Sequence, residues 1–160
     1  FRAVFRLDRD TSGLIMVAKH ELAAAKLSGK IKKDYYAVLT GVPENKSGII
    51  NAPIARCGDS IIKRKVSPDG EYSVSEYKTI KISNGNALVK FNLLTGRTHQ
   101  IRVHSAYIGH PLLGDTMYGG DTALIKRQAL HCKDIYFTHP VTETEMHLSC
   151  DFPSDIKEVL

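Results

Sequence analysis

The sequence predicts an α+β domain in which a mostly antiparallel mixed sheet is flanked by a few helices. Two hairpin patterns stand out in its second half, one around Ser83-Asn84-Gly85-Asn86 and one around His139-Pro140-Val141-Thr142. The Asn-Gly pair supplies the positive backbone dihedral angles that a tight hairpin turn requires. Strands and helices do not alternate regularly, which disfavours a parallel α/β fold.

The first half of the chain is predicted to hold short strands and one helix. Residues 12–18 form an apolar run of strand length. Residues 21–32 are rich in Ala, Leu and Lys, with apolar residues at helical spacing, which indicates a helix. Residues 34–41 contain aromatic and β-branched residues and lead into a Gly-Val-Pro turn, which indicates a strand. Two further short strands are expected at 48–54 and 60–66.

The second half is predicted to hold two hairpins with a helix between them. Residues 71–82 and 87–94 flank the Asn-Gly turn, and apolar residues alternate along the second arm. Residues 98–108 carry a helical stripe of apolar and small residues, and a Gly and a Pro then end the helix. The last hairpin joins 129–138 to 145–151, and a Pro-Ser pair opens a terminal helix.

Composition and charge favour a globular protein with an anionic partner. The chain has 160 residues, enough for one domain with a sizeable core, and a formal net charge of +5. A moderately basic surface suits a polyphosphate. No apolar run approaches the roughly 20 residues that span a bilayer, and the first residues lack a signal-peptide layout. We therefore expect no membrane contact and a cytoplasmic location.

The three cysteines do not form a recognisable framework. Cys57, Cys132 and Cys150 are odd in number and widely spaced, with no Cys-x-x-Cys pair. This spacing argues against a disulfide scaffold and against a structural zinc site. Because His99 and His104 are five residues apart, they do not share one face of a helix as a metal-binding pair would. We expect free thiols and no metal.

Polar residues concentrate in two segments, 6–13 and 95–104. The second runs from a strand end into a helix start, where amides and side chains can converge on an anion. The first contains Asp8-Arg9-Asp10-Thr11, which fits the Asp-x-Asp loop of magnesium-dependent phosphatases. Its residues Asp10-Thr11-Ser12-Gly13 also resemble the Asp-Thr-Gly of aspartic proteases, with one extra residue inside the motif. A turn with surface ion pairs is the structural alternative.

Taken together, the motifs resemble those of the RluA-type pseudouridine synthases, which modify ribosomal and transfer RNA. The segment from Phe5 to Leu14 is similar to their His-Arg-Leu-Asp-x-x-Thr-Ser-Gly-Leu motif, and Lys33 to Ala37 is similar to Lys-x-Tyr-x-Ala. Leu94 to His104 matches the third motif almost letter for letter. The similarity continues through 109–119, Arg127-Gln128-Ala129-Leu130-His131 and 139–142, so it covers nearly the whole chain.

This resemblance implies a role for each of eight residues. Asp8 would be the essential carboxylate, Tyr35 the tyrosine beside the target base, and Arg102 the basic partner of Asp8. The side chains expected to contact RNA are Arg6, Arg9, Arg97, His99 and Gln100. The implied partner is structured RNA, either rRNA or tRNA, and the isomerisation requires no cofactor or metal. We expect the chain to act as a monomer.

The sequence departs from the family pattern in two places. Phe5 stands where the family usually has His, which we expect to alter packing or RNA contact more than catalysis. The family's catalytic domain has more strands before the Asp motif, so residues 1–160 are expected to be an N-terminally truncated catalytic domain without a separate RNA-binding domain. A catalytically inactive RNA-binding module of the same fold is the second hypothesis, and a phosphatase is the third.

Overall fold

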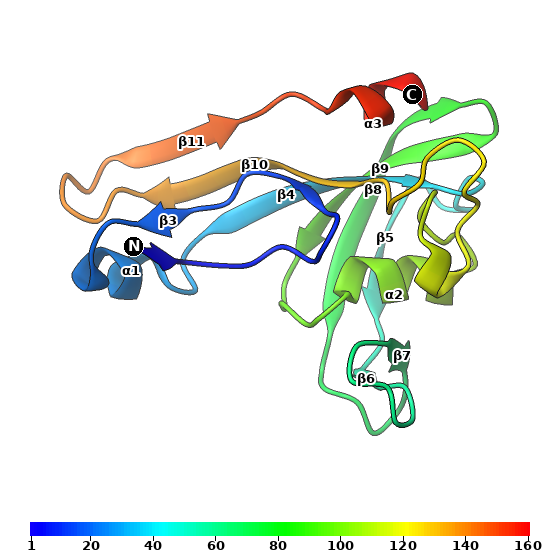
Figure 1. Ribbon diagram of the computed structural model, residues 1–160, viewed down its shortest axis with the longest axis horizontal. Helices are drawn as coiled ribbons and strands as arrows, with labels where there is room; N and C mark the ends of the chain where they lie inside the picture. The colour runs from blue at the N-terminus through cyan, green and yellow to red at the C-terminus, as the bar shows by residue number, and fades with distance from the viewer.

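The computed structural model describes residues 1–160, and a seven-stranded sheet dominates it (Figure 1). The strand order is β11-β10-β4-β9-β8-β5, and β2 joins by pairing with β10. All pairings in this sheet are antiparallel except that of β2 with β10, so the predicted α+β class is confirmed. The elements are β1 (Arg2–Ala3), β2 (Ser12–Gly13), β3 (Val17–Ala18), α1 (Glu21–Leu27), β4 (Lys32–Leu39), β5 (Ser47–Asn51), β6 (Ile54–Arg56), β7 (Arg64–Val66), β8 (Val74–Ser83), β9 (Asn86–Leu93), α2 (Gln100–Tyr107), η1 (Thr116–Tyr118), β10 (Leu130–Thr138), β11 (Glu145–Ser149) and α3 (Ser154–Glu158).

The sheet buries apolar side chains on both of its faces because successive strand residues point to opposite sides. Tyr35 and Ala37 of β4 belong to the larger core, which Ile101 of α2 also joins. Val38 of the same strand belongs to a second core with Ile156 of α3. Figure 1 shows α2 and α3 on opposite sides of the central strands. The longest helix, α2, has 8 residues, so no helix is long enough to cross a membrane.

Both predicted hairpins are confirmed. β8 and β9 are antiparallel neighbours, and their turn places Asn84 at φ 50° and Gly85 at φ 76°. Two consecutive positive φ values match the turn type that Asn-Gly favours, because its twist agrees with that of the strands. β10 and β11 form the second hairpin, with Thr138 opposite Glu145 at its closed end.

Two predicted helices are shorter than expected. The first was predicted over 21–32 but ends at Leu27, because Gly29 is left-handed at φ 72° and Lys32 already belongs to β4. The second was predicted from Thr98 but begins at Gln100. His99 has φ 57°, a conformation that a right-handed helix cannot contain.

Two predicted strands are divided. The apolar run 12–18 was predicted as one strand, yet it forms β2 and β3, which pair with β10 and β1 respectively. The segment 48–54 is interrupted before β6, at Ala52-Pro53, where proline lacks an amide donor.

The strand predicted at 60–66 is confined to β7, since the Ser60 side chain accepts hydrogen bonds from Ile62 and Lys63 in a turn. β6 and β7 form a separate hairpin at the bottom of Figure 1.

Candidate active site

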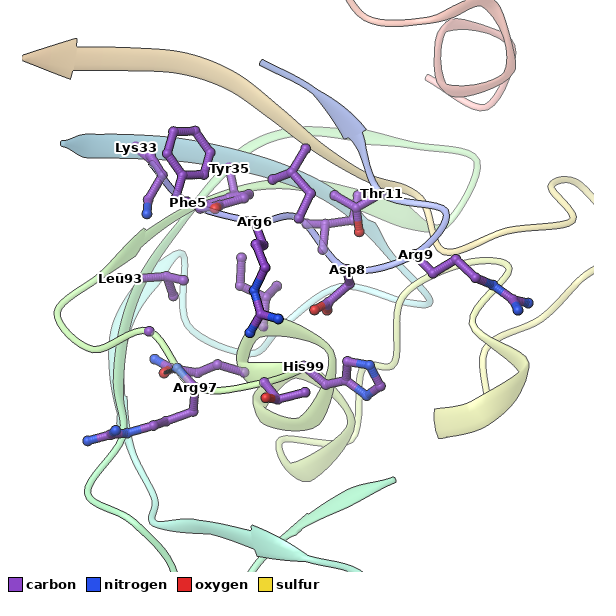
Figure 2. Close-up of a pocket in the computed structure, with 16 residues that line it drawn as sticks. Phe5, Arg6, Asp8, Arg9, Thr11, Lys33, Tyr35, Leu93, Arg97 and His99 are labelled. Atoms are coloured by element: carbon purple, nitrogen blue, oxygen red, sulfur yellow. Dashed lines mark hydrogen bonds between the residues drawn. The ribbon is translucent and has the colours of Figure 1, made fainter. Parts of the chain in front are cut away.

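A cavity of about 410 Å³ opens on the α2 side of the sheet, and segments far apart in the sequence line it (Figure 2). Asp8 comes from the loop after β1, Tyr35 from β4, and His99 from the connection between β9 and α2. Asp8 is the only carboxylate in its wall. The basic side chains of the wall are Arg6, Arg9, Lys33 and Arg97. This charge balance suits an anionic ligand brought to one reactive carboxylate.

A tight turn presents Asp8 to the cavity. The Asp8 carbonyl accepts a hydrogen bond from the Thr11 amide at 3.0 Å, and Asp10 is left-handed at φ 68°. Gly13 then adopts φ 120°, and a Cβ atom there would lie 2.2 Å from the carbonyl oxygen of Cys132. Only glycine therefore lets β2 approach β10 this closely. The Asp8 side chain remains 25% exposed, recessed but open to the cavity.

Two side chains from late in the sequence hold the backbone of this turn. Gln128 donates from Nε2 to the Arg9 carbonyl, and Arg127 donates from Nη1 to the Asp10 carbonyl at 3.1 Å. Asp155 of α3 fixes the Arg127 guanidinium through bonds of 2.7 and 2.8 Å. These contacts position Asp8 indirectly. Neither Arg127 nor Gln128 was predicted to have a site role, although both lie in the closing family-like segment.

Arg102 is placed between two carboxylates. It donates two hydrogen bonds to Asp115, at 2.7 and 2.8 Å, while its Nη1 lies 3.9 Å from Asp8 Oδ2. Both Arg102 and Asp115 are buried, with side chains 7% and 1% exposed. Arg102 was predicted as the partner of Asp8, and the structure does bring them together. The bidentate partner, however, is Asp115, which the sequence analysis did not identify.

Tyr118 of η1 joins Arg102 to His99. Its ring centre lies 5.0 Å from the Arg102 guanidinium carbon, and its hydroxyl forms a 2.8 Å hydrogen bond with Nδ1 of His99. Burial raises the pKa of Tyr118 and lowers the pKa of His99, so both are neutral near pH 7. The Tyr118 oxygen also accepts a hydrogen bond from the Arg64 amide at 3.0 Å, so two contacts hold the phenol in place.

Tyr35 forms part of the wall opposite α2. It is 7% exposed, and burial is the main cause that raises the pKa of its hydroxyl well above the ordinary value. The neighbouring Cys132 and the charge of Asp8 raise it further. Tyr35 therefore keeps its proton at neutral pH and offers a flat ring with a hydrogen-bond donor to a ligand in the cavity.

The predicted RNA-contacting arginines occupy different positions around the cavity. Figure 2 shows Arg6 extending into the space beside Asp8. The Arg9 side chain points away from Asp8, is 94% exposed and pairs with Asp10. Arg97 reaches outward and bonds to Glu71 at 2.7 Å, with 38% of its side chain exposed. All three can meet an anionic ligand, and Arg6 is the one that extends into the space beside Asp8.

Gln100, by contrast, supports the site from beneath. It is 2% exposed, and its Oε1 accepts bonds from the Thr95 hydroxyl and the Arg97 amide. Its Nε2 donates to the Val74 carbonyl and the Ser75 hydroxyl. Both donors and the acceptor are thus used within the protein, so Gln100 holds the β9–α2 connection in place and has no free group for RNA.

The phosphatase interpretation of Asp-x-Asp is wrong. That fold requires a parallel sheet with alternating helices, whereas the only parallel pairing here is β2 with β10. Asp10 pairs with Arg9 and does not line the cavity. No group of three or more His, Cys, Asp or Glu side chains lies close enough to hold a metal ion.

Comparisons with known proteins agree on one family. The family described as RNA pseudouridylate synthase matches residues 1–107. A Bacillus subtilis (strain 168) protein described as an uncharacterized RNA pseudouridine synthase is 44% identical over 162 residues, which cover 98% of this chain and 57% of that protein. The Vibrio cholerae ribosomal large subunit pseudouridine synthase D is 38% identical over 175 residues, covering 98% of this chain and 54% of its own.

A solved structure shows the same architecture. The human RNA pseudouridylate synthase domain containing 1 superimposes with a TM-score of 0.83 at 25% identity, covering 96% of this chain and 69% of the human chain. The chain spans slightly more than half the length of the two curated relatives. The fold and the sequence motifs therefore lead to the same group of proteins.

Proposed function

This chain belongs to the RNA pseudouridylate synthase family, and we propose that it converts uridine in RNA to pseudouridine with Asp8 as the essential carboxylate. The observation that supports this most directly is the cavity itself. It holds one recessed carboxylate and a neutral tyrosine within a basic rim, and the buried Arg102 lies 3.9 Å behind that carboxylate. We further propose that residues 1–160 form the catalytic domain.

The isomerisation breaks the bond between C1′ and N1, turns the uracil, and joins C1′ to C5, which then loses its proton while N1 gains one. Asp8 can attack the sugar, attack the base or remove the 2′ proton, and each route requires an ionised carboxylate. Arg102 supplies a permanent positive charge 3.9 Å from that carboxylate. Because Asp115 holds the guanidinium in a planar fork, this charge stays in place during the reaction.

Tyr35 is proposed to contact the uracil. Stacking of a base on an aromatic ring contributes on the order of 1–3 kcal/mol and tolerates the turning of the base. Its raised pKa keeps the hydroxyl protonated, so it serves as a hydrogen-bond donor beside the base. A neutral, immobile phenol suits a step in which the uracil is detached but must not escape.

The substrate we propose is structured RNA, either rRNA or tRNA. Asp8 is recessed, so a uridine must leave its helix and enter the cavity to meet it. We propose that Arg6 at the centre and Arg97 at the rim contact the phosphates of the flipped nucleotide, which their positions and positive charges support. The Vibrio cholerae relative is described as acting on the ribosomal large subunit, which favours rRNA. We propose a cytoplasmic location, where such a substrate is found.

The test is tritium release from RNA labelled at C5 of uridine, with bulk rRNA and tRNA as probes. Asp8→Asn should abolish release and leave RNA binding within a few fold. Asp10→Asn is the matched control, because Asn tolerates the left-handed backbone of Asp10 and that carboxylate does not line the cavity. It should retain release close to wild type. Turnover by Asp8→Asn would remove Asp8 from the mechanism.

A catalytically silent RNA-binding module is the competing function. It predicts no tritium release from wild type, together with salt-sensitive binding of the same RNA. The presence of Asp8 and Tyr35 around one cavity, with Arg102 beside Asp8, favours the enzyme.

A further inference from the structure

A second cavity of about 280 Å³ lies beside the catalytic one and shares part of its wall. The residues common to both are Phe5, Lys33, Leu93 and Gly96. Figure 2 shows Phe5, Lys33 and Leu93 together on the side of the catalytic cavity away from Arg9. An RNA chain with one nucleotide in the first cavity can therefore place its next nucleotide in the second.

The second cavity has an apolar lining and no carboxylate. Its floor includes Leu27, which is 6% exposed, and its rim includes Leu94, which is 62% exposed. The Thr95 hydroxyl in its wall is already used, since it donates to Gln100 and accepts the Val74 amide. The remaining lining residues are Val4, Phe5, Gly29, Ile31, Lys32, Lys33, Leu93 and Gly96. No side chain among them can read a hydrogen-bonding pattern, except the two lysines.

Lys33 is a half-buried ammonium group without an anionic partner. None of the ion pairs in the structure includes it. Its Nζ lies 4.5 Å from the centre of the Phe5 ring, at the boundary of the two cavities. An incoming phosphate would supply the missing negative charge and leave the ring as an apolar surface.

We infer that the second cavity binds the base of the nucleotide adjacent to the target uridine, with the intervening phosphate at Lys33. This inference rests on the proposed function and adds a specificity subsite to it. Because the lining is apolar and offers Phe5 as a ring, the subsite selects a base by size and stacking rather than by hydrogen bonds. It therefore accepts any base, prefers purines and rejects a nucleotide that lacks one.

The experiment uses short synthetic RNAs that carry the uridine located by the tritium assay. Either neighbour of that uridine is replaced by each other base or by an abasic nucleotide, and kcat/KM is measured for the full chain. For wild type, removing the base at one neighbouring position should lower kcat/KM by about 5- to 100-fold. Removing the base on the other side should have a smaller effect.

Two variants test whether the second cavity causes this loss. Phe5→Ala removes the ring. Leu94→Glu places a carboxylate at the exposed rim, and because Leu94 is not a core residue, this second test does not depend on the folding of a core variant. The abasic penalty is the factor by which kcat/KM falls when the neighbouring base is removed. In both variants this factor should fall towards one. Leu124→Glu is the matched control, since Leu124 is 59% exposed and lies outside both cavities, and its penalty should equal that of wild type.

Two results would overturn the subsite. One is a wild-type penalty below twofold at both neighbours, and the other is a full penalty in both cavity variants. Failure of the proposed function has a different signature, because wild type would then release no tritium from bulk RNA. That result would remove the subsite together with the activity on which it rests.

Discussion

The buried ion pair between Arg102 and Asp115 should contribute strongly both to the free energy of unfolding and to activity. Asp115→Asn removes the charge opposite a guanidinium that is 7% exposed. Breaking a buried ion pair by neutralising one partner costs about 3–5 kcal/mol. Asn keeps an acceptor for one of the two bonds, so we expect about 3 kcal/mol. At roughly 2–4 °C per kcal/mol for a chain of this length, Tm should fall by about 6–12 °C.

The same substitution should slow catalysis while the variant remains folded. Without Asp115, the guanidinium is free to turn towards Asp8, and a misplacement of about 1 Å is worth about 100-fold in rate. We expect kcat for tritium release to fall about 10- to 100-fold at a temperature below the variant's transition.

Circular dichroism melts at one protein concentration measure the stability, and tritium release measures kcat. Glu76→Gln is the control, because Glu76 lies exposed on β8 and forms no ion pair, so it should stay within about 0.5 kcal/mol of wild type. A loss below about 1 kcal/mol in Asp115→Asn, with kcat unchanged, would refute the argument. Asp8 alone would then suffice to hold Arg102.

Three further predictions concern the turn that carries Asp8 and the buried histidines. Gln128→Leu removes the donor to the Arg9 carbonyl, so kcat should fall about tenfold with KM within about twofold, because Asp8 is displaced while the RNA-contacting rim is intact. Gly13→Ala should cost about 1–3 kcal/mol in urea unfolding, because φ 120° is unfavourable for alanine and its Cβ meets the Cys132 carbonyl. Burial lowers the pKa of His99, His104 and His131, so the unfolded chain takes up protons first as pH falls through about 6.5. The free energy of unfolding therefore has its full value above that pH and falls below it, by up to about 1.4 kcal/mol per pH unit for each histidine. His104→Gln should make this dependence on pH less steep when the free energy of unfolding is measured by urea titration.

Each of these has an outcome that contradicts it. If kcat/KM of Gln128→Leu fell about tenfold through a higher KM, with kcat unchanged, Gln128 would act on RNA binding instead of on Asp8. A Gly13→Ala variant as stable as Gly96→Ala, whose Cβ would meet open space, would show that β2 can shift without cost. An unchanged pH slope in His104→Gln would show that the other histidines and not His104 carry the titration.

Local chemistry explains which parts of the fold were predictable. The Asn84-Gly85 turn and the alternation of β9 act over neighbouring residues, so pattern alone located that hairpin. The ends of α1 and α2 were misjudged because single left-handed residues, Gly29 and His99, set them. The partners of the run 12–18 were also out of reach, since the β2–β10 pairing joins residues more than a hundred positions apart.

For the site, the sequence by itself determined the family and supplied the candidate residues Asp8, Tyr35 and Arg102 from motifs. The structure places Asp8 and Tyr35 around one cavity with Arg102 beside Asp8. Only the tertiary structure decided which carboxylate holds Arg102, since Asp8 and Asp115 are the same residue type in the sequence and differ in burial and in their distance from the guanidinium. It also turned Gln100 inward, because a buried amide must satisfy its donors and acceptor within the protein. Motifs record chemistry that neighbouring residues share, whereas partner choice and burial arise when distant segments meet.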